Sequence, residues 1–531
     1  MKRFAIVTWL LLTFSGLNLF GQALTSLSGT VKDPSGAVVP GASVTLTSVL
    51  TGAQRQDTSD SAGRYSFPQL QPGKYKMSAI AEGFSEQVIN SIELLVNTPA
   101  TINISFEKIG TVAEVISVSA EALQVSTEDA SLGNAIGNRP ITQLPFEARN
   151  VVGLLALQPG VSYFGENVAD DFRSGAVNGG KSDQSNIVLD GVDVNEQQDR
   201  NAFTSVLRVT LDSVEEFRTT TSNANADQGR GPGAQVSLIT KSGTNDLHGS
   251  LYEYHRNTAT SANSFFNNMA GVERQKLIRN VFGASAGGPI KKNRVFFFLN
   301  YEGRRDAIES PALRIVPNAL YRQGIFTYKR TDGSLGQLTP SQIKNDVDPL
   351  HIGPSPAVLE LLQSYPLPNT DVVGDLLNTA GFRFKTSTPL RYNTYIAKFD
   401  AQLDASGKHM LFWRGNLQND NDALGVPQFP GDPASSVALA NNKGYAIGYT
   451  WVARSALINN FHYGFTREGA QTTGIQTQAA VTLRDIDARN ALTRGLTQII
   501  PVHTITDDVA WTHGAHSVAV GGIVRLFGIT G

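Results

Sequence analysis

The sequence predicts a mainly β protein, and three observations support this class. The 531 residues include 50 Gly and 23 Pro, which suits many turns between short strands better than long helices. Segments with an apolar residue at every second position recur along the chain, and this is the period of a half-buried strand. Beyond the first residues, no apolar run is long enough to span a membrane as a helix. Any later membrane span must therefore be made of strands.

Composition excludes several classes of function. Charged residues make up 17% of the chain and the net charge is -2, so no basic excess points to a nucleic-acid partner. The chain has no cysteine, which excludes disulfides, thiolate zinc sites and a thiol nucleophile. The length itself suggests several domains.

Residues 1–23 have the features of a signal peptide. Lys2 and Arg3 form a short positive region, and an apolar run follows over residues 4–20. Gly21 and Ala23 then place small residues at the two positions that a signal peptidase reads. The alternative is an anchoring transmembrane helix, but the cleavage site favours removal after export.

Residues 24–107 predict a small β-sandwich. Turn signals at residues 33–36 and 60–63 separate short segments, and residues 42–46 alternate as a half-buried strand does. Roughly six or seven strands in this length are typical of a sandwich.

Residues 108–241 predict a mixed α/β domain. A helix is expected from Leu144 through Leu157, ended by the Pro-Gly pair at residues 159–160. Strands are expected near residues 187, 214 and 234.

Residues 242–531 predict part of a transmembrane antiparallel β-barrel. Tyr395 and Phe399 alternate with Lys398, and Trp413 alternates with Arg414, within segments of about ten residues. Aromatic outward faces and polar inward faces are the barrel pattern. The alternative is a soluble sandwich with the same alternation, but repeated aromatic hairpins behind a signal peptide favour the membrane.

Two motifs suggest enzymes but lack the required context. Residues 175–182 match the phosphate-loop pattern, yet neither a buried strand before them nor a helix after them is predicted. Residues 283–287 place Ser285 in a nucleophile-elbow pattern, but the following Gly-Gly-Pro forbids the helix that an elbow needs. Small residues at a barrel turn are the better interpretation of the second motif. We predict no catalytic residue, no cofactor site and no enzymatic activity.

Metal binding is not expected either. His513 and His516 lie three apart in a strand-like context, which would place them on opposite faces. The acidic residues between Asp190 and Asn195 lack the spacing of a calcium loop, so a solvated turn is expected there.

The sandwich region resembles a known domain family. Its two stretches "SGTVKDPSGAVVPGASVTL" and "SDSAGRYSFPQLQPGKYKMSAIAEGF" are similar to the carboxypeptidase regulatory-like domain. The resemblance implies a prealbumin-like, carbohydrate-binding-like β-sandwich. Sugar binding itself would be only a fold-level analogy.

The rest of the chain resembles the Oar-type TonB-dependent outer-membrane receptors. The resemblance rests on "LPFEARNVVGLLALQPGV", "SNIVLDGVDVN", "SVEEFRTTTSNANADQGRGPGAQVSLITKSGTNDLHGSLYEYHRN", "NSFFNN" and "RNVFGASAGGPIKKNRVFFFLNYEGRR". It implies that residues 108–241 include a plug domain inside a barrel formed by residues 242–531. It further implies location in the cell outer membrane, with membrane lipid around the barrel and the N-terminal domain in the periplasm.

The resemblance also implies a partner-binding segment ahead of the plug. In such receptors a short stretch binds the periplasmic protein TonB, and here Glu114, Val115, Ile116 and Val118 look like that TonB box. The physical mode would be strand addition through backbone hydrogen bonds. The alternative is a strand that merely joins two domains.

We therefore expect a TonB-dependent receptor that takes up an extracellular ligand, with carbohydrate and oligopeptide as the classes suggested by analogy. The alternative is an adhesin or surface carbohydrate-binding protein without transport. Plugged barrels of this kind have about 22 strands and need well over 400 residues. The barrel region offers only roughly eight to ten candidate strands, so the sequence looks truncated within its barrel, as a fragment or a broken gene.

Overall fold

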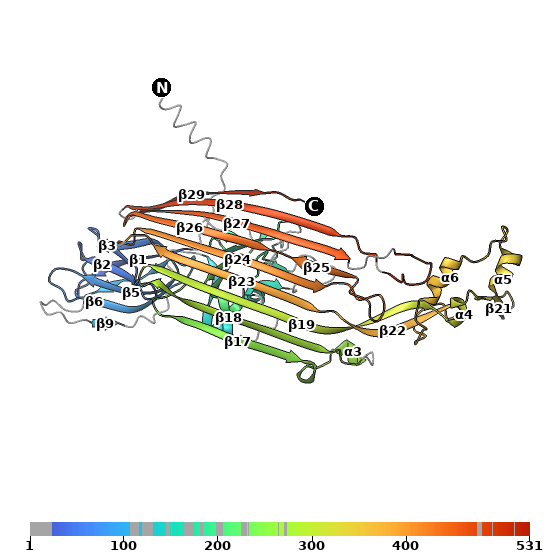
Figure 1. Cartoon of the computed structure of the whole chain (residues 1–531). Coiled ribbons are helices and arrows are strands. Elements are labelled where there is room, and N and C mark those ends of the chain that lie inside the picture. The colour runs from blue at the N-terminus through green and yellow to red at the C-terminus, as the bar shows by residue number, and fades with distance from the viewer. Residues whose placement is uncertain are drawn as a thin grey trace, which may run out of the picture.

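The computed structural model places the N-terminal sandwich at one end of a long curved sheet, and the mixed α/β domain lies against one face of that sheet (Figure 1). It describes residues 24–106, 116–118, 131–144, 149, 151–163, 175–180, 184–197, 205–224, 231, 233–263, 265–269, 273–404, 406–474, 480–490, 492–513 and 516–530. The predicted signal peptide lies outside these residues. Within them, no helix combines the length and the apolar character needed to cross a membrane.

The N-terminal domain has two sheets that enclose one apolar core. The first sheet has the order β4-β1-β7, with β8 also paired to β1, and the second has the order β3-β2-β5-β6-β9. Their bounds are β1 Thr25–Lys32, β2 Ser43–Ser48, β3 Gln54–Thr58, β4 Arg64–Leu70, β5 Gly73–Ile80, β6 Gln87–Leu94, β7 Ala100–Thr101, β8 Ile104–Ser105 and β9 Ile116–Val118. Alternate residues of β1, including Leu27 and Val31, are buried between the sheets, as period two requires. The predicted sandwich is confirmed.

The next domain, which we call the plug, is built on a five-stranded mixed sheet of order β10-β15-β16-β13-β14. Its elements are β10 Leu132–Gly137, α2 Asn138–Gln143, a 3₁₀ helix Val151–Leu157, β13 Asn186–Leu189, β14 Val192–Asp193, a 3₁₀ turn Leu211–Ser213, β15 Val214–Ser222 and β16 Gln235–Thr240, with a separate hairpin of β11 Val161–Tyr163 and β12 Gly175–Val177. The strands predicted near residues 187, 214 and 234 are present.

The helix predicted from Leu144 to Leu157 is wrong in position and type. The α-helix ends before Leu144, which adopts an extended conformation, and the apolar residues form a 3₁₀ helix from Val151. Five of its seven residues are buried in the plug core. A run this short and this apolar does not reveal its helical period in the sequence.

The barrel wall is one antiparallel sheet of eleven strands. Their bounds are β17 His248–Asn257, β18 Leu277–Lys291, β19 Val295–Pro317, β22 Thr379–Ser387, β23 Leu390–Gln402, β24 His409–Ala423, β25 Ser436–Ala440, β26 Lys443–Arg454, β27 Leu457–Gly474, β28 Leu496–His513 and β29 His516–Phe527. β22 and β23 both pair with β19, and β25 and β26 both lie between β24 and β27. Each pair is thus one long strand with a short break, which leaves nine continuous strands out of the eleven.

The two faces of the wall differ as the sequence predicts. Tyr395 is 47% exposed and Phe399 is 39% exposed on one face, whereas Lys398 between them is only 7% exposed. Likewise Trp413 is 38% exposed and Arg414 is fully buried. The buried polar face contacts the plug, and we call it the inner face. The aromatic face is the outer face.

The connections at the two ends of the wall differ in length. At the sandwich end, adjacent strands are joined by turns of a few residues, such as residues 292–294 and 455–456. At the other end, residues 318–378 form a small subdomain with α4 Ala319–Arg322, β20 Phe326–Lys329, β21 Leu335–Leu338, α5 Pro340–Gln342 and α6 Pro356–Gln363 (Figure 1). Barrels of the outer membrane have short periplasmic turns and longer extracellular loops. This asymmetry agrees with the expectation that the sandwich is on the periplasmic side.

The subdomain of residues 318–378, called the loop subdomain below, shares a small core with two other loops. Leu362 and Tyr365 pack with Phe429 and Ile486, and all four are buried. Tyr365 also donates a hydrogen bond of 2.9 Å from its hydroxyl to the carbonyl oxygen of Asp487. Three long connections are therefore held together at the end of the wall opposite the sandwich.

Candidate functional site

The plug contacts the inner face of the wall at a buried cluster centred on Asp190. This residue follows β13 in the plug and has a positive φ of 47°. Its carboxylate accepts hydrogen bonds from the backbone N–H of Thr240 at 3.0 Å and from the Thr240 hydroxyl at 2.7 Å. It also pairs with Lys398 Nζ at 3.4 Å and with Arg414 Nε at 3.2 Å. A plug loop is thus fixed to two neighbouring wall strands.

In the Asp190 cluster one carboxylate lies between two cations. Burial alone would raise the pKa of Asp190, but the positive Lys398 and Arg414 hold it below its ordinary value. Arg414 uses its other donors as well, to the carbonyl oxygen of Leu189 at 3.1 Å and to Asn416 Oδ1 at 2.7 Å. Removal of Asp190 would leave both cations away from water without their shared carboxylate.

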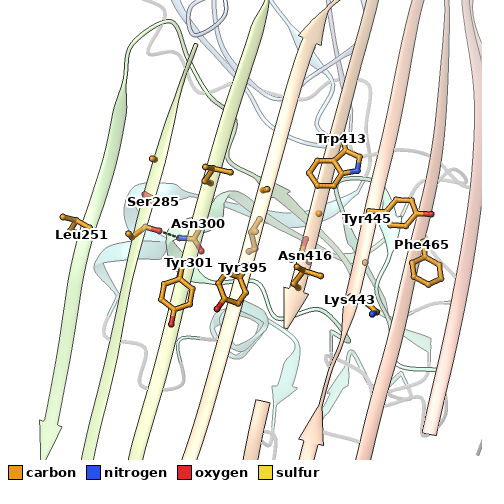
Figure 2. Close-up of a pocket in the computed structure, with 18 residues that line it drawn as sticks. Leu251, Ser285, Asn300, Tyr301, Tyr395, Trp413, Asn416, Lys443, Tyr445 and Phe465 are labelled. Atoms are coloured by element: carbon orange, nitrogen blue, oxygen red, sulfur yellow. Dashed lines mark hydrogen bonds between the residues drawn. The ribbon is translucent and has the colours of Figure 1, made fainter. Parts of the chain in front are cut away.

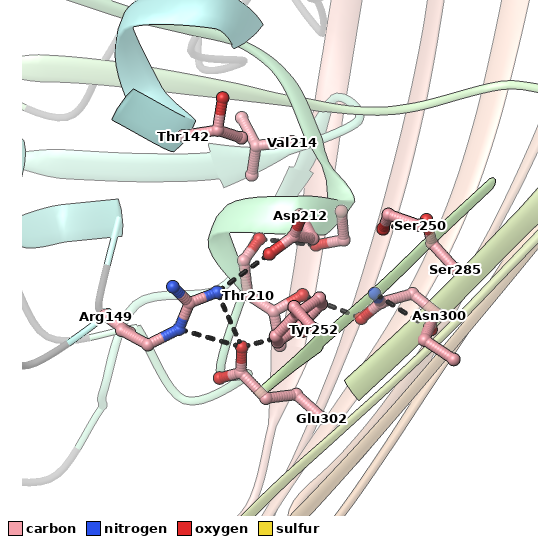
Figure 3. Close-up of polar contacts among 12 residues, drawn as sticks. Thr142, Arg149, Thr210, Asp212, Val214, Ser250, Tyr252, Ser285, Asn300 and Glu302 are labelled. Atoms are coloured by element: carbon pink, nitrogen blue, oxygen red, sulfur yellow. Dashed lines mark hydrogen bonds and ion pairs between the residues drawn. The ribbon is translucent and has the colours of Figure 1, made fainter. Parts of the chain in front are cut away.

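A second cluster lies where the plug meets the first strands of the wall. In Figure 3 the Arg149 guanidinium lies between Asp212 of the plug and Glu302 of β19, at 2.7 Å and 3.1 Å. The hydroxyl of Tyr252 on β17 donates to the same Glu302 carboxylate at 2.9 Å. The Arg149 guanidinium also stacks 4.3 Å above the ring of Tyr254.

Further polar contacts continue along the interface. Arg208 of the plug forms two hydrogen bonds to the Asp420 carboxylate on β24, at 3.0 Å and 2.7 Å. Asp193, in the plug hairpin, pairs with Arg525 on β29. The plug is therefore attached to wall strands from β17 to β29.

Two glycines of the wall make room for apolar plug residues. A Cβ atom at Gly464 would lie 2.2 Å from Val192 Cγ1, and one at Gly444 would lie 2.8 Å from Leu207 Cδ1. Such separations are far below van der Waals contact, so only glycine fits without a shift of the plug.

The acidic stretch from Asp190 to Asn195 was expected to be a solvated turn, and this expectation is wrong. Asp190 is 6% exposed, Asp193 is 2% exposed and Asn195 is 8% exposed. The cations that compensate Asp190 and Asp193 come from wall strands more than 200 residues later. The only sequence signal for this site was the presence of Lys398 and Arg414 at inward positions among aromatic residues.

The structure describes the nucleophile-elbow motif fully and the phosphate-loop motif in part. Ser285 lies in the middle of strand β18 and not at a barrel turn as expected; its hydroxyl is 2.8 Å from that of Ser250. No helix follows it, as the sequence predicted. Gly175–Val177 form strand β12, while Lys181 and Ser182 lie outside the described residues.

The histidine pair was placed on opposite faces of one strand, and this is wrong. His513 is the last residue of β28 and His516 is the first of β29, and the two are cross-strand partners, so they lie on the same face of the sheet. Among the residues that the structure describes, no cluster of three or more His, Cys, Asp or Glu could hold a metal ion.

The TonB-box-like segment is described only in part. Glu114 and Val115 lie outside the described residues, and Ile116–Val118 form strand β9. This strand pairs in parallel with β6, and Ile116 is opposite Gln87. Ile116–Val118 therefore occupy the edge of a sandwich sheet.

The sandwich and the plug meet at a buried carboxylate. Glu216 on β15 accepts hydrogen bonds from the backbone N–H of Val96 at 2.9 Å and 3.1 Å. Burial raises the pKa of Glu216 to about 7, against the lowering effects of the Val96 N–H and of Arg218.

This carboxylate should make the sandwich–plug contact depend on pH. Because the folded pKa is above the unfolded value, the contribution of Glu216 to stability is fully present below about 4.5 and is lost as pH rises through about 7. We expect the Glu216→Gln variant to lack this loss, which is at most about 3 kcal/mol. The measurement is the unfolding free energy of both proteins at pH 5 and pH 8. Equal pH dependence in both proteins would contradict the assignment.

Comparison with known proteins identifies the wall. A family model described as an outer membrane beta barrel domain matches residues 239–529, which is more than half of the 531 residues. The chain belongs to this outer membrane β-barrel family. A second model, the carboxypeptidase regulatory-like domain, matches residues 26–107 of this barrel protein.

Individual relatives are more distant. The barrel protein is 26% identical over 301 residues to the TonB-dependent transporter Oar of Myxococcus xanthus. This match covers 54% of this chain and 27% of the relative. The outer membrane transporter YddB from Escherichia coli has a TM-score of 0.47 at 12% identity, with 72% of this chain and 46% of that chain covered. The siderophore receptor PirA from Acinetobacter baumannii has a TM-score of 0.44 at 12% identity, with 74% and 48% covered. The chain thus spans about a quarter of the curated relative and about half of these solved structures.

The comparisons confirm several predictions. The barrel protein is located in the outer membrane, its fold is mainly β, and its N-terminal domain is a carboxypeptidase regulatory-like sandwich. The resemblance to Oar-type receptors is confirmed as well. The prediction that the chain is not an enzyme agrees with this family membership and with the transporter relative.

Proposed function

We propose that this chain carries the plug and the first part of the barrel of a TonB-dependent outer-membrane transporter. The main support is the way the plug is attached to the inner face of the wall. Most of these contacts are ion pairs and hydrogen bonds, centred on Asp190, Arg149 and Arg208. Water can replace such contacts when they open, so a pulling force can loosen the plug without exposing a large apolar surface. The relationship to the transporter Oar supports this function.

In this proposal the TonB box consists of Glu114, Val115, Ile116 and Val118. Strand addition needs a segment with free backbone hydrogen-bonding groups, and β9 already uses this mode when it pairs with β6. TonB would either displace β9 from β6 or add to the other edge of β9. The segment lies between the sandwich and the plug, so a force applied there reaches the plug along the chain.

The extracellular ligand would bind to the loop subdomain and the outer side of the plug. Carbohydrate and oligopeptide are the two classes we propose, the first by analogy with the fold of the sandwich. Binding of the purified protein to glycan and peptide arrays separates the two classes.

Proline substitution tests the TonB box. Proline removes a backbone N–H and disrupts an added strand, so Val118→Pro should abolish the contact with TonB. Because the chain has no cysteine, a single Ser117→Cys substitution allows disulfide trapping with a cysteine-substituted TonB in intact cells.

The matched control is Val125→Pro, which places the same residue further along the same linker. We expect trapping to persist in this control and to disappear with Val118→Pro. If trapping survives Val118→Pro, the box is misassigned. If no TonB is trapped by any variant, the result contradicts the proposal and favours the alternative, a surface adhesin or carbohydrate-binding protein without transport.

A further inference from the structure

Charged side chains are distributed unevenly over the wall. Its outer face is aromatic and apolar, as Figure 2 shows around Tyr395, Trp413 and Phe465, and the lining of this region contains one charged residue, Lys443. The sandwich end is different. There a cavity of about 830 Å³ lies between the sandwich and the ends of the wall strands. All of its lining residues belong to the sandwich or the wall, so it is separate from the plug contacts described above.

The lining of this cavity, called the basic cavity below, contains six cations and no carboxylate among the described residues. Three hairpin turns of the wall contribute, between β18 and β19, between β23 and β24, and between β26 and β27, together with β2 and β3 of the sandwich. The cations are Arg55 on β3, Lys291, Lys292 and Arg294 at the first turn, Lys408 at the second and Arg454 at the third. No ion pair between described residues involves any of the six. A cleft lined by one sign of charge attracts ligands of the opposite sign.

Two carboxylates near the basic cavity are directed to other donors. Asp57, two residues after Arg55 on β3, interacts with the charge of Arg55, but its Oδ2 accepts the backbone N–H of Ser66 at 2.9 Å. Asp404, in the second turn, accepts the backbone N–H of His409 at 2.9 Å. Neither carboxylate lines the cavity, which therefore keeps its positive charge.

The basic cavity also offers hydrogen-bonding groups. Arg55 donates from Nη1 to the carbonyl oxygen of Pro68 at 2.8 Å, whereas its Nη2 is buried and has no hydrogen-bond partner in the described part of the chain. Most of the remaining lining side chains are amides or hydroxyls: Thr45, Gln54, Gln56, Asn293, Gln402, Ser406 and Ser455. Val452 and Ala453 are the only aliphatic side chains among the described lining residues, so the cavity offers little surface for an acyl chain.

One edge of the sandwich is open at this cavity. β3 is the last strand of its sheet, and among the described strands it pairs only with β2. The carbonyl oxygen of Ala53, just before β3, accepts the backbone N–H of Ser48. Because an antiparallel pair bonds through alternate residues, the odd-numbered residues of β3 bond to β2. The backbone N–H and C=O of Gln56 therefore point to the open edge, where an added extended chain can bond to them.

The three turns lie in a row along the end of the wall. Successive turns are two strands apart, because β18, β19, β23, β24, β26 and β27 are paired in this order. At about 4.8 Å per strand, the first turn and the third are roughly 19 Å apart. An extended peptide rises about 3.3 Å per residue, so about six residues cover this distance. A single phosphate or lipid headgroup is too small to contact all three turns at once.

We infer that the basic cavity binds an extended acidic peptide segment of a partner protein, with its carboxylates beside Lys292, Lys408 and Arg454 and its backbone beside Gln56. Charge complementarity, the open strand edge and the spacing of the turns select this occupant. β9, with part of the proposed TonB box, lies at the opposite edge of the same sheet, so the two sites are separate. The inference takes only the compartment of the partner, the periplasm, from the proposed function.

Fluorescence anisotropy of the purified full chain in detergent micelles tests the inference. The probe is a fluorescein-labelled hexaglutamate peptide, and a hexaglutamine peptide of the same length is its uncharged counterpart. We expect hexaglutamate to bind at one site, more weakly as salt is added, and hexaglutamine not to bind. The double variant Lys292→Gln, Lys408→Gln removes a cation from two of the turns and should weaken binding about tenfold.

The matched control is the double variant Lys32→Gln, Lys329→Gln, which removes two exposed lysines outside the basic cavity and should bind hexaglutamate as the original protein does. Circular dichroism checks that each variant keeps its strands. Equal weakening in the two double variants would overturn the inference, as would equal binding of the two peptides. Displacement of hexaglutamate by the same concentration of inorganic phosphate, or by phosphatidylglycerol but not phosphatidylcholine in the micelles, would assign the cavity to a small anion or a lipid instead. Because TonB is absent from this measurement, its outcome is independent of the trapping experiment.

Discussion

Replacement of Asp190 by alanine is expected to cause the largest loss of stability among single substitutions in the plug. Lys398 and Arg414 would remain buried without their shared carboxylate, and Thr240 would lose the acceptor for its hydroxyl and its N–H. Breaking a buried ion pair from one side costs roughly 3–5 kcal/mol. The free energy of unfolding from detergent micelles, followed by urea titration, measures this cost.

Two comparisons make the Asp190 result specific. Asp371→Ala in the exposed part of the loop subdomain removes a carboxylate from the surface and should change stability by less than about 0.5 kcal/mol. The triple variant Asp190→Ala, Lys398→Met, Arg414→Met should recover much of the loss, because the two cations that lost their carboxylate are then absent as well. If the triple variant is as unstable as the single one, the cost does not come from the unpaired cations.

The second large effect is expected at Gly464. A leucine there would overlap Val192, since even a Cβ would lie 2.2 Å from that side chain. The plug hairpin of β13 and β14 would have to move away from β27, which would also separate Asp193 from its wall contacts. Overpacking of this kind costs about 1–3 kcal/mol. We expect faster cleavage of the plug by added protease while the wall itself stays resistant.

Gly522→Leu is the matched control for this prediction. Gly522 is also in a wall strand, β29, and a Cβ there would meet no atom within 4 Å. Its substitution should leave protease resistance unchanged. Equal sensitivity of both variants would show that leucine disturbs the wall rather than the plug contact.

The parts of the fold that follow from local periodicity were predictable. Tyr395 and Phe399 face outward and Lys398 faces inward because side chains of a strand alternate whatever the rest of the chain does. Because β22 and β23 form one interrupted strand, as do β25 and β26, the sheet has nine continuous strands, within the roughly eight to ten that the sequence predicts.

The candidate site was less predictable because its contacts are distant in sequence. Asp190 and Arg414 are 224 residues apart, so nothing near Asp190 reveals that a cation will cover it. The 3₁₀ helix at Val151–Leu157 was misjudged for the related reason that packing in the plug core decides its conformation. The assignment of the TonB box to Glu114, Val115, Ile116 and Val118 stays a prediction.

In the proposed transporter, the length of β19 would affect the order of events in uptake. Its 23 residues extend over roughly 75 Å at about 3.3 Å each, whereas the apolar band of such a barrel is only about 25 Å tall. The loop subdomain is therefore held well beyond the membrane on a paired, stiff extension of the wall. A ligand captured there would be released into a small volume above the plug. Its next binding event, to the plug, would then resemble binding within one molecule. Its effective concentration at the plug would then be set by the geometry of this extension and not by the ligand concentration of the medium.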